Sequence, residues 1–305
     1  MGKIQKLIKY VIDADYRFAI DSRFGKYDSM PDEEFLKRRF RSAMGKELDL
    51  ENPQTFNEKL QWLKLYDCNP EYTRIVDKYE FKNYIAEKIG AEYTVPTLGR
   101  WDSFDDIDFD SLPDKFVLKC NHDSGTLVIC KDKSKLDVKK ARKKLSKALK
   151  KDFYLRHREW PYKDVKPCII AEKYLDLSDP PIEYKLFSFN GSAKIILVCK
   201  GIAHTSNRTN TFYDRDFNKL PIQSLLPNQI EKEEKPAEYE KLLEIADKLS
   251  EGIPQVRVDF YISDGQIYVG EMTFFHNAGF CKINPEEWDK KMGDMIPLDI
   301  VKKYN

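Results

Sequence analysis

Apolar and polar residues alternate along residues 255–275, and this pattern predicts a β-hairpin. Side chains of a strand point to opposite faces in turn. The apolar residues at the even positions of 256–262 therefore share one face, while Arg257 and Asp259 lie on the other. The Ser-Asp-Gly sequence at 263–265 predicts the turn. We expect a three-residue loop with its glycine in the left-handed conformation, because it leaves one coherent apolar face.

This three-residue loop brings polar groups of both strands onto one face. It pairs position 257 with position 271, and the shared polar face then consists of Arg257, Asp259, Glu271 and Thr273. The two carboxylates become diagonal neighbours, about 7–8 Å apart at the backbone, while Tyr268, Gly270 and Met272 face the core. Two converging carboxylates suit Mg²⁺, which prefers oxygen ligands. The alternative is a solvated sheet face with an Arg–Glu cross-strand pair.

Helices and short apolar strands account for most of the remaining pattern. Helices are predicted at 1–50, at two places within 55–90, at about 135–151 and at two places within 228–250. Asn57 is expected to cap the first helix of 55–90 and Gly90 to end the second. Strands are predicted at 94–99, 116–121, 126–132, 168–175 and on both sides of an Asn190-Gly191 turn. Residues 201–221 remain as a long loop, and loops of that length are usually functional or disordered.

The N-terminal helix is amphipathic. Ile4, Leu7, Ile8 and Val11 form an apolar stripe, and lysines lie outside it. Two interpretations remain open for this stripe. The helix either docks on its own domain or lies on a membrane surface.

Composition excludes several classes of protein. The chain has 305 residues and a formal net charge of +1, and its 34% charged residues are balanced, so no overall field favours nucleic acid as a partner. No run approaches the ~18 apolar residues of a transmembrane segment, and the N-terminus lacks the features of a secretory signal. The six cysteines form no C-x-x-C pair and are expected to be reduced thiols of a cytosolic protein. The four histidines lack metal-ligand spacing.

Lysines on predicted strands are the candidate phosphate ligands, because the chain has neither a Walker motif nor a dinucleotide-binding glycine motif. Lys119 interrupts the apolar strand FVLKCN directly before the small polar loop NHDSGT. A strand lysine followed by a glycine-containing turn can reach a polyphosphate while backbone N–H groups close over it. Lys185 shares a face with Glu183, and Glu172 and Lys173 end another apolar strand. Each of these residues alone is more typical of ordinary surface charge.

The order of these features is specific. A strand lysine, a glycine loop, a second strand and a helix come first. An apolar strand ending in E-K-Y-L, an acid-x-basic strand and a hairpin with Asp and Glu twelve residues apart follow. In this order, and in segments such as FVLKCNHDSGT, EYKLFSFNG and NTFYDRDFNKLP, about residues 55–290 resemble the TupA-like (teichuronopeptide biosynthesis) branch of the ATP-grasp superfamily.

The resemblance implies an α+β ATP-grasp fold, in which two α+β lobes clasp ATP. The implied regions are a basic helical N-terminal extension (1–54), a helical pre-ATP-grasp region (55–115), a small lobe (116–175) and a large lobe with the metal hairpin (176–305).

The resemblance also implies a nucleotide site. Lys119 and Lys185 would bind the phosphates, with Glu183 at the ribose and Glu172 at the adenine amino group. Further contacts would come from a phosphate-covering loop and from the backbone at the adenine edge: Ser124, Gly125, Lys173, Tyr174 and Leu175.

One or two Mg²⁺ ions would accompany the nucleotide. The implied metal ligands are Asp259, Glu271, Thr273 and Asn277, and the implied catalytic residues are Arg257, Lys185 and His276. The superfamily commonly carries E-x-N where this chain has Glu-Met-Thr. Because a hydroxyl is a weaker ligand than an amide oxygen, the departure puts the second Mg²⁺ in doubt.

Two loops are candidate lids, at 121–126 and 201–221. Candidate contacts to an anionic acceptor such as a uronic acid are His122, His204, Arg208 and Arg215. The alternatives are a solvated loop for the residues in 201–221 and ordinary hydrogen-bonded histidines.

The family name implies a ligase that joins an amino acid or amine to a sugar carboxylate through an acyl phosphate, in bacterial cell-surface polysaccharide biosynthesis (capsule, O-antigen or teichuronopeptide). Its partners would be ATP, Mg²⁺, the sugar carboxylate and the amine. Alternatives are a kinase on a glycan precursor, a glycosyltransferase and a non-catalytic ATP-binding scaffold. The protein would be cytoplasmic, and it would lie at the inner face of the membrane if the N-terminal helix contacts lipid or a glycosyltransferase complex.

Overall fold

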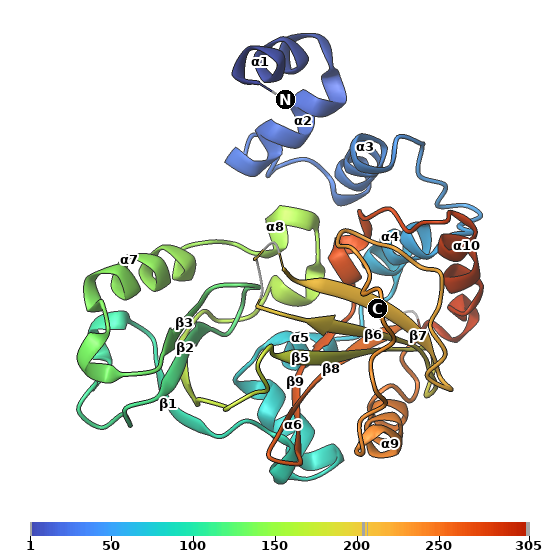
Figure 1. The fold of residues 1–305 in the computed structure, drawn as a ribbon. Helices are drawn as coiled ribbons and strands as arrows, with labels where there is room; N and C mark the ends of the chain where they lie inside the picture. The colour runs from blue at the N-terminus through green and yellow to red at the C-terminus, as the bar shows by residue number, and fades with distance from the viewer. Residues whose placement is uncertain (1, 203–204, 206, 303–305) are drawn as a thin grey trace.

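Two antiparallel β-sheets organise the chain (Figure 1). The computed structural model describes residues 2–202, 205 and 207–302. The four-stranded sheet contains β1 (Thr97–Trp101), β2 (Phe116–Cys120), β3 (Leu127–Cys130) and β4 (Ile169–Lys173), in the order β1-β4-β2-β3. The five-stranded sheet contains β5 (Ile182–Ser188), β6 (Ala193–Lys200), β7 (Thr209–Asp214), β8 (Val256–Ser263) and β9 (Gln266–Thr273), in the order β7-β6-β5-β8-β9.

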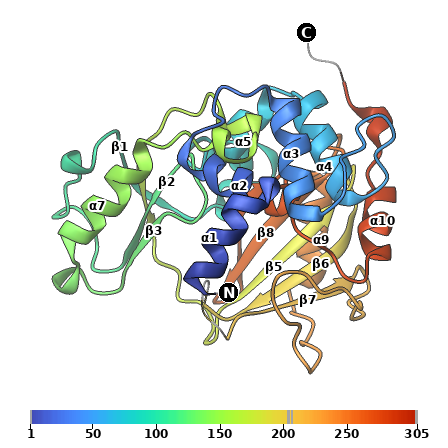
Figure 2. The ribbon, with the colours of Figure 1, turned by 90° about the horizontal axis from the view of Figure 1, so that it is seen from above.

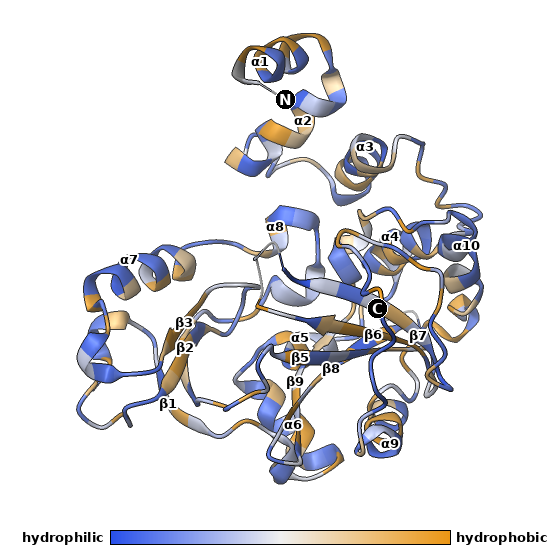
Figure 3. Cartoon of the chain, viewed as in Figure 1, coloured by the Kyte–Doolittle hydropathy of each residue, from blue (hydrophilic) through white to orange (hydrophobic). Residues whose placement is uncertain are grey.

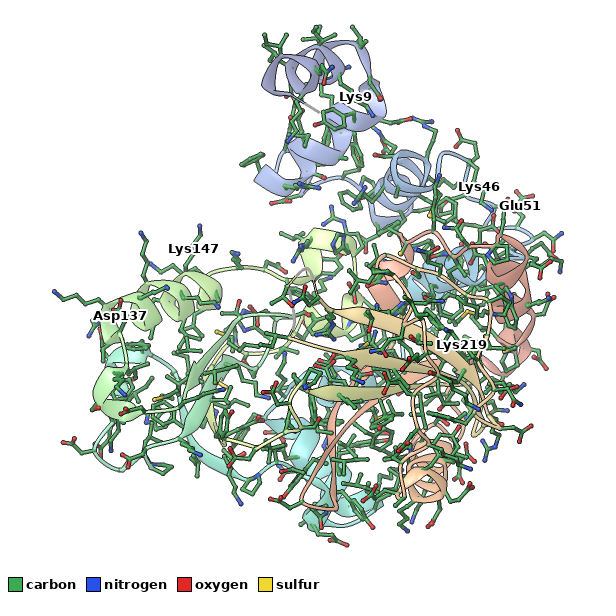
Figure 4. The ribbon with its side chains drawn as sticks, in the orientation of Figure 1. Lys9, Lys46, Glu51, Asp137, Lys147 and Lys219 are labelled. Carbon is green, nitrogen blue, oxygen red and sulfur yellow. The ribbon has the colours of Figure 1, made fainter. Side chains whose placement is uncertain are left out.

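The lysine-rich helix α7 (Val138–Leu149) covers one face of the four-stranded sheet. Its buried Ala141 and Leu145 pack in one cluster with Leu118 of β2, while its lysines face solvent, as Lys147 does in Figure 4. β1 pairs with β4 in this sheet. The predicted boundary at residue 115 would therefore separate β1 from the other strands of its sheet. The sequence pattern does not show this, because pairing between distant segments leaves no trace in local pattern.

Helices pack around the five-stranded sheet and share its core. Helix α9 (Tyr239–Leu249) contacts β5, β6 and β8, and helix α10 (Glu287–Asp294) packs on α4 (Phe56–Tyr66). The core cluster unites these elements with α5 (Glu71–Val76) and α6 (Glu80–Lys88). The helical region before the lobes is thus part of the five-stranded sheet's core.

Several predicted elements differ from the observed ones. Residues 55–90 form three helices instead of two, and Thr55 caps the first by accepting a hydrogen bond from the backbone of Glu58, which reciprocates. Asn57 lies inside that helix. Residues 228–250 contain only α9 within the described chain, and the long loop 201–221 contains the edge strand β7. Short 3₁₀ turns occur at Ser22–Phe24, Ala91–Tyr93, Phe104–Asp106, Lys133–Lys135, Trp160–Tyr162 and Leu298–Ile300.

The hairpin of β8 and β9 corrects the predicted turn. Ser263 pairs with Gln266, so the loop has two residues, Asp264 and Gly265, both with positive φ (53° and 73°). The two-residue loop alone would split the polar groups between two faces. A β-bulge at Gly270 shifts the register by one residue and brings Asp259 directly opposite Glu271.

The predicted polar face is therefore correct, although its predicted cause is wrong. Arg257 pairs with Thr273 instead of Glu271. The core side of β9 consists of Ile267, Val269 and Met272, whereas Tyr268 and Gly270 were expected there.

The N-terminal helices lie beyond the two sheets in Figure 1, and in Figure 2, which is seen from above, they lie in front of the sheets. They are α1 (Lys3–Ile12), α2 (Ala14–Asp21) and α3 (Asp32–Met44). Helices α2 and α3 bury a small core of Phe18, Phe35, Leu36 and Phe40. Ile4, Leu7, Ile8 and Val11 are exposed, so the interpretation that α1 docks its apolar stripe on its own domain is wrong. No helix among the described residues is long and apolar enough to cross a membrane.

Arg158 joins these helices to the body of the protein. It follows α8 (Tyr154–His157), and its guanidinium is fully buried. One of its nitrogens donates to the carbonyls of Tyr27 at 2.8 Å, Asp28 at 3.0 Å and Met30 at 3.1 Å.

A left-handed backbone segment follows β9. Asn277, Ala278 and Gly279 have φ values of 49°, 54° and 65°. Helix α4 fixes this segment from one side: Gln61 donates to the carbonyls of Ala278 at 3.1 Å and Gly279 at 2.8 Å. The segment is consequently held by packing and hydrogen bonds, which a conformation costly for side-chain-bearing residues requires.

Replacing Gly279 tests how tightly this segment is packed. A Cβ at Gly279 would overlap the Gln61 amide and approach Leu60. We expect Gly279→Ala to lower the free energy of unfolding by roughly 1–2 kcal/mol because of the left-handed conformation and by a further ~1–3 kcal/mol because of overpacking. Urea unfolding measures this loss. Gly252→Ala is the matched control, because Gly252 also has a positive φ (73°) but no neighbour within 4 Å of the added atom. Equal losses in the two variants would contradict the packing account.

Candidate active site

A buried carboxylate anchors the polar face of the five-stranded sheet. Asp259 on β8 lies opposite Lys185 on β5 and is only 2% exposed. Its Oδ1 accepts a hydrogen bond from Arg257 Nε at 2.6 Å, and its Oδ2 accepts from Arg257 Nη2 at 2.6 Å and from Lys185 Nζ. Burial opposes the charge, but Arg257 and Lys185 outweigh it and lower the pKa of Asp259 to about 2. The carboxylate is therefore ionised throughout the physiological pH range.

The network continues along β5 toward β7. Lys185 Nζ lies 3.1 Å from Glu183 Oε2, and Arg208 Nη2 donates to the same oxygen at 2.8 Å. Burial acts against the ionised form of Glu183, yet Lys185 and Arg208 lower its pKa. Arg208 is thus brought into the site, next to the residue predicted to hold the ribose.

In the other direction the network passes through His276. Arg257 Nη1 lies 2.6 Å from His276 Nδ1, and His276 Nε2 lies 2.9 Å from the Asn277 amide. An arginine can only donate, so Nδ1 is the acceptor and the neutral ring carries its proton on Nε2. The Asn277 amide then accepts a hydrogen bond from Nε2 through its oxygen, in the flipped orientation of the amide. Burial, reinforced by the positive charge of Arg257, holds the pKa of His276 well below its usual range. The ring is therefore neutral and orients Arg257.

Glu271 is the least restrained acid of this face. Its side chain is 41% exposed, and Oε1 lies 3.4 Å from Arg257 Nη2 and 3.5 Å from the Thr273 hydroxyl. Thr273 also accepts from Arg257 at 3.1 Å. These groups converge as the sequence predicts. On this face, the oxygen atoms that are left available belong to Glu271 and its neighbour Thr273.

The donor chemistry at this face fits one Mg²⁺ ion. Among the described residues, no group of three or more His, Cys, Asp or Glu side chains lies close enough to form a metal cage. Mg²⁺ commonly uses one or two carboxylates and takes its other ligands from phosphates and water. Glu271 offers such a carboxylate, whereas both oxygens of Asp259 are already occupied by Arg257 and Lys185.

A second buried carboxylate organises the four-stranded sheet. Glu172 on β4 is 6% exposed, and its Oε2 pairs with Lys119 of β2 while its Oε1 lies 2.8 Å from Lys82 of α6. Burial raises the pKa of Glu172, but the two ammonium groups outweigh it and the pKa falls. Both oxygens of Glu172 are thus engaged. Glu172 therefore positions Lys119, and the contact with adenine that the resemblance implies for Glu172 stays a prediction.

Lys78 lies near charged groups of both sheets, Lys119 of the four-stranded sheet and Glu271 of the five-stranded sheet. Its ammonium donates to the carbonyls of Asn121, at 3.4 Å, and Asp123. Burial lowers its pKa, Glu271 and Asp123 oppose that shift, and Lys119 reinforces it. Sequence reasoning missed both Lys78 and Lys82. They belong to a helical segment with ordinary polar neighbours, and no local signal marks them as site residues.

The loop after β2 presents backbone groups near Lys119. Asn121 fixes its start, because its side chain donates to Asp77 at 2.9 Å and accepts from the backbone of Cys168 at 2.7 Å. Ser124 and Gly125 are exposed, and Gly125 has a φ of 88° with open space around it. His122 is buried, which lowers the pKa of its ring, while Asp123 and the backbone of Ala148 oppose that shift.

Apolar side chains lie on the same face of the four-stranded sheet as Lys119. Val117 pairs with Ile129, and Lys119 pairs with Leu127, so these residues share one face. Ile129 is 53% exposed although it lies on a strand. Such a flat apolar surface beside two lysines is suited to an aromatic base. Tyr174 and Leu175 directly follow β4, in the segment that leads to β5.

One predicted substrate residue, Arg215, is not brought into this network. Arg215 donates to Asp247 of α9 at 2.7 Å and to the carbonyl of Ala193 at 2.8 Å. These bonds tie the end of β7 to α9, away from Lys185, so the geometry gives Arg215 a structural role. His204 lies outside the described residues.

Comparison with solved structures finds proteins of related architecture. A D-alanine–D-alanine ligase from Bacillus anthracis, solved with ATP, is 21% identical, with 66% of this chain and 55% of that chain covered and a TM-score of 0.38. An L-amino acid ligase from Bacillus licheniformis is 14% identical, with 73% and 49% covered and a TM-score of 0.45. The chain spans about half the length of these two structures. No characterised protein matches it significantly in sequence.

Comparison with protein families gives a match over most of the chain. The family model described as "TupA-like ATPgrasp" matches residues 58–297. The match includes both sheets, the two buried carboxylates, helix α6 with Lys82 and the turn before it with Lys78. The chain therefore belongs to the TupA-like ATP-grasp family.

Proposed function

We propose that this enzyme binds ATP between the two sheets and joins a sugar carboxylate, such as that of a uronic acid, to an amino acid or amine. The supporting observation is the pair of buried carboxylates, Asp259 and Glu172, each of which holds two cationic side chains. These cations are fixed before any substrate arrives. Phosphoryl transfer depends mainly on such positioning and on neutralisation of charge.

The nucleotide would lie along both sheets. Lys119, oriented by Glu172, binds the α- and β-phosphates, and Lys185 binds the phosphates from the opposite sheet. The exposed apolar face of Ile129 supports the base, and the backbone of 173–175 meets its edge. Glu183 is the ribose acceptor, and the exposed loop with Ser124 and Gly125 covers the phosphates.

Mg²⁺ would be held chiefly by Glu271, with Thr273 and Asn277 as weaker neighbouring donors and Asp259 as the charge behind them. When bound, the ion neutralises the oxygens of the β- and γ-phosphates. The chain's own part is to keep Arg257 in place. Asp259 and the neutral His276 fix its guanidinium, so that one edge of it can contact the transferred phosphate.

The reaction would proceed in two steps. An oxygen of the sugar carboxylate attacks the γ-phosphorus, the bond to the β-phosphate oxygen breaks, and ADP leaves behind an acyl phosphate. The amine then attacks the acyl carbon, phosphate leaves, and an amide remains. Arg208, paired with Glu183 beside Lys185, is the candidate contact for the anionic acceptor. His122 and the segment that contains His204 are further candidates.

The setting would be the cytosolic side of cell-surface polysaccharide synthesis, which the resemblance to teichuronopeptide-biosynthesis proteins implies. ATP is available there, and all six cysteines are free thiols, as that compartment requires. The name of the family and the positive charge of Arg208, the candidate contact for the acceptor, support a uronic acid over a neutral sugar.

Product analysis distinguishes the proposed reaction from its alternatives. The enzyme is incubated with ATP, Mg²⁺ and a panel of uronic acids and amino acids, and the products are identified by mass spectrometry. We expect ADP release that needs both a carboxylate and an amine, with an amide product. A phosphorylated sugar formed without an amine would indicate a kinase, and consumption of a nucleotide sugar would indicate a glycosyltransferase. ATP binding without turnover on any acceptor would indicate a scaffold.

Lys119 and Glu172 should determine nucleotide affinity. Charge-assisted phosphate contacts are worth roughly 1.5–3 kcal/mol, so Lys119→Ala should weaken ATP binding about ten- to hundredfold in calorimetric titration. Glu172→Gln should weaken it less, because Lys119 remains but loses its orientation. Lys147→Ala on the outer face of α7 is the control and should bind ATP normally. Unchanged affinity in folded Lys119→Ala protein would remove Lys119 from the site.

Glu271 and Asp259 should respond differently to loss of charge. Glu271→Gln should cost under about 1 kcal/mol of stability, because its ion pair is partly exposed, yet it should reduce turnover about a hundredfold and raise the Mg²⁺ concentration for half-maximal rate. Asp259→Asn should also lose turnover and should cost ~3–5 kcal/mol, because Arg257 and Lys185 would stay buried without their counter-charge.

Turnover and thermal unfolding of these variants are measured together. The double variant should lose little more activity than either single one, since residues that act as a unit are non-additive. Glu244→Gln on the surface of α9 controls for loss of an acid. Full activity in Glu271→Gln would exclude the metal site.

A further inference from the structure

Helix α1 carries its apolar side chains toward solvent. Ile4, Leu7, Ile8, Val11 and Ile12 are between 52% and 76% exposed, although the same spacing would form the buried stripe of an ordinary amphipathic helix. Figure 3 shows the strongly hydrophobic colour of α1 at the end of the molecule that lies farthest from the sheets. We call these five residues the α1 apolar face.

Hydrogen bonds fix α1 with this face outward. Tyr10 donates to Asp21 of α2 at 2.5 Å, and Arg17 of α2 donates to the carbonyls of Tyr10 at 3.1 Å and Val11 at 2.7 Å. The side of α1 that contains Tyr10 is thereby bound to α2. The apolar face is left without a partner by the fold itself.

The charges of this region suit an anionic surface. The sequence of α1 contains three lysines and no acid, and Lys6 and Lys9 are exposed. Figure 4 shows Lys9 on this outlying part of the chain. The acids of this region are paired with cations: Asp13 with Lys9 at 3.8 Å, Asp15 with Arg41 at 3.0 Å and Asp21 with Lys26 at 2.6 Å.

The size of the face favours a lipid surface over another protein. A helix of ten residues is about 15 Å long and about 10 Å wide, which is far less than the ~800 Å² per partner of a stable protein interface. A bilayer needs no such area, because individual apolar side chains enter the interfacial region while lysines contact anionic headgroups.

We propose that α1 docks this enzyme on the surface of a bilayer that contains anionic lipids. The α1 apolar face enters the headgroup region, and the lysines of α1 contact the phosphates. Because α1 lies at one end of the molecule (Figure 1), docking leaves both sheets and the site between them in the aqueous phase. The inference is independent of the substrates proposed above.

Vesicle sedimentation with the full chain tests this proposal. The protein is mixed with vesicles of phosphatidylcholine and with vesicles in which one third of that lipid is replaced by phosphatidylglycerol. We expect binding mainly to the second kind. Leu7→Glu with Val11→Glu should weaken it at least about tenfold, because apolar insertion is lost. Lys6→Gln and Lys9→Gln should each weaken it about fivefold.

Matched variants on other surfaces complete the test. Ile230→Glu replaces an apolar side chain that is 98% exposed elsewhere on the chain, and Lys143→Gln with Lys147→Gln removes two exposed lysines of α7. Both controls should bind vesicles as the unmodified protein does. Failure of the unmodified protein to bind anionic vesicles, or equal binding by the Leu7 and Val11 variant, would overturn the proposal. Self-association that depends on Leu7 and Val11, seen by analytical ultracentrifugation without vesicle binding, would assign the face to a second copy instead.

Discussion

The ion pairs of Asp259 with Arg257 and Lys185 are the constraint on which the site depends. A carboxylate that is 2% exposed is stable as an ion only because two cations contact it. The reverse also holds, since burial of Arg257 and Lys185 without Asp259 would be costly. The fold thus holds two positive groups at fixed positions on a sheet, where a polyphosphate can replace water as their second partner. Most of the desolvation that such a contact requires has occurred during folding.

The same arrangement recurs on the other sheet, and this links the helical region to the chemistry. Glu172 holds Lys119 from its own sheet and Lys82 from α6, and Lys78 comes from the turn before that helix. Helices α4 to α6 also share the core of the five-stranded sheet. A segment that the sequence places before the two lobes is therefore the element that connects them, and two of its lysines complete the charge balance of the site.

The sequence predicts the periodic parts of this structure well and the long-range parts poorly. Alternation identifies β8, β9 and the Asn190-Gly191 hairpin, and strand-borne lysines identify Lys119 and Lys185, because these signals are local. The hairpin shows the limit. Alternation cannot distinguish a three-residue loop from a two-residue loop followed by a bulge, since both restore one polar face. Lys78 and Lys82 are not predictable for a different reason, because their partners are far away in the chain. Lys82 pairs with Glu172, and Lys78 donates to the carbonyls of Asn121 and Asp123.

Helix α4 extends the network to the far end of the site. Gln61 and the buried Lys64 both donate to the Ala278 carbonyl, at 3.1 Å and 2.8 Å. Burial lowers the pKa of Lys64, and the nearby Glu159 opposes that shift. These bonds hold the left-handed segment that directly follows His276, and His276 in turn orients Arg257. A rigid backbone turn thus determines where a guanidinium points. This explains why three consecutive residues adopt a conformation that only strong local restraint can maintain: relaxation of the turn would release the histidine, and Arg257 would retain its charge but lose its direction.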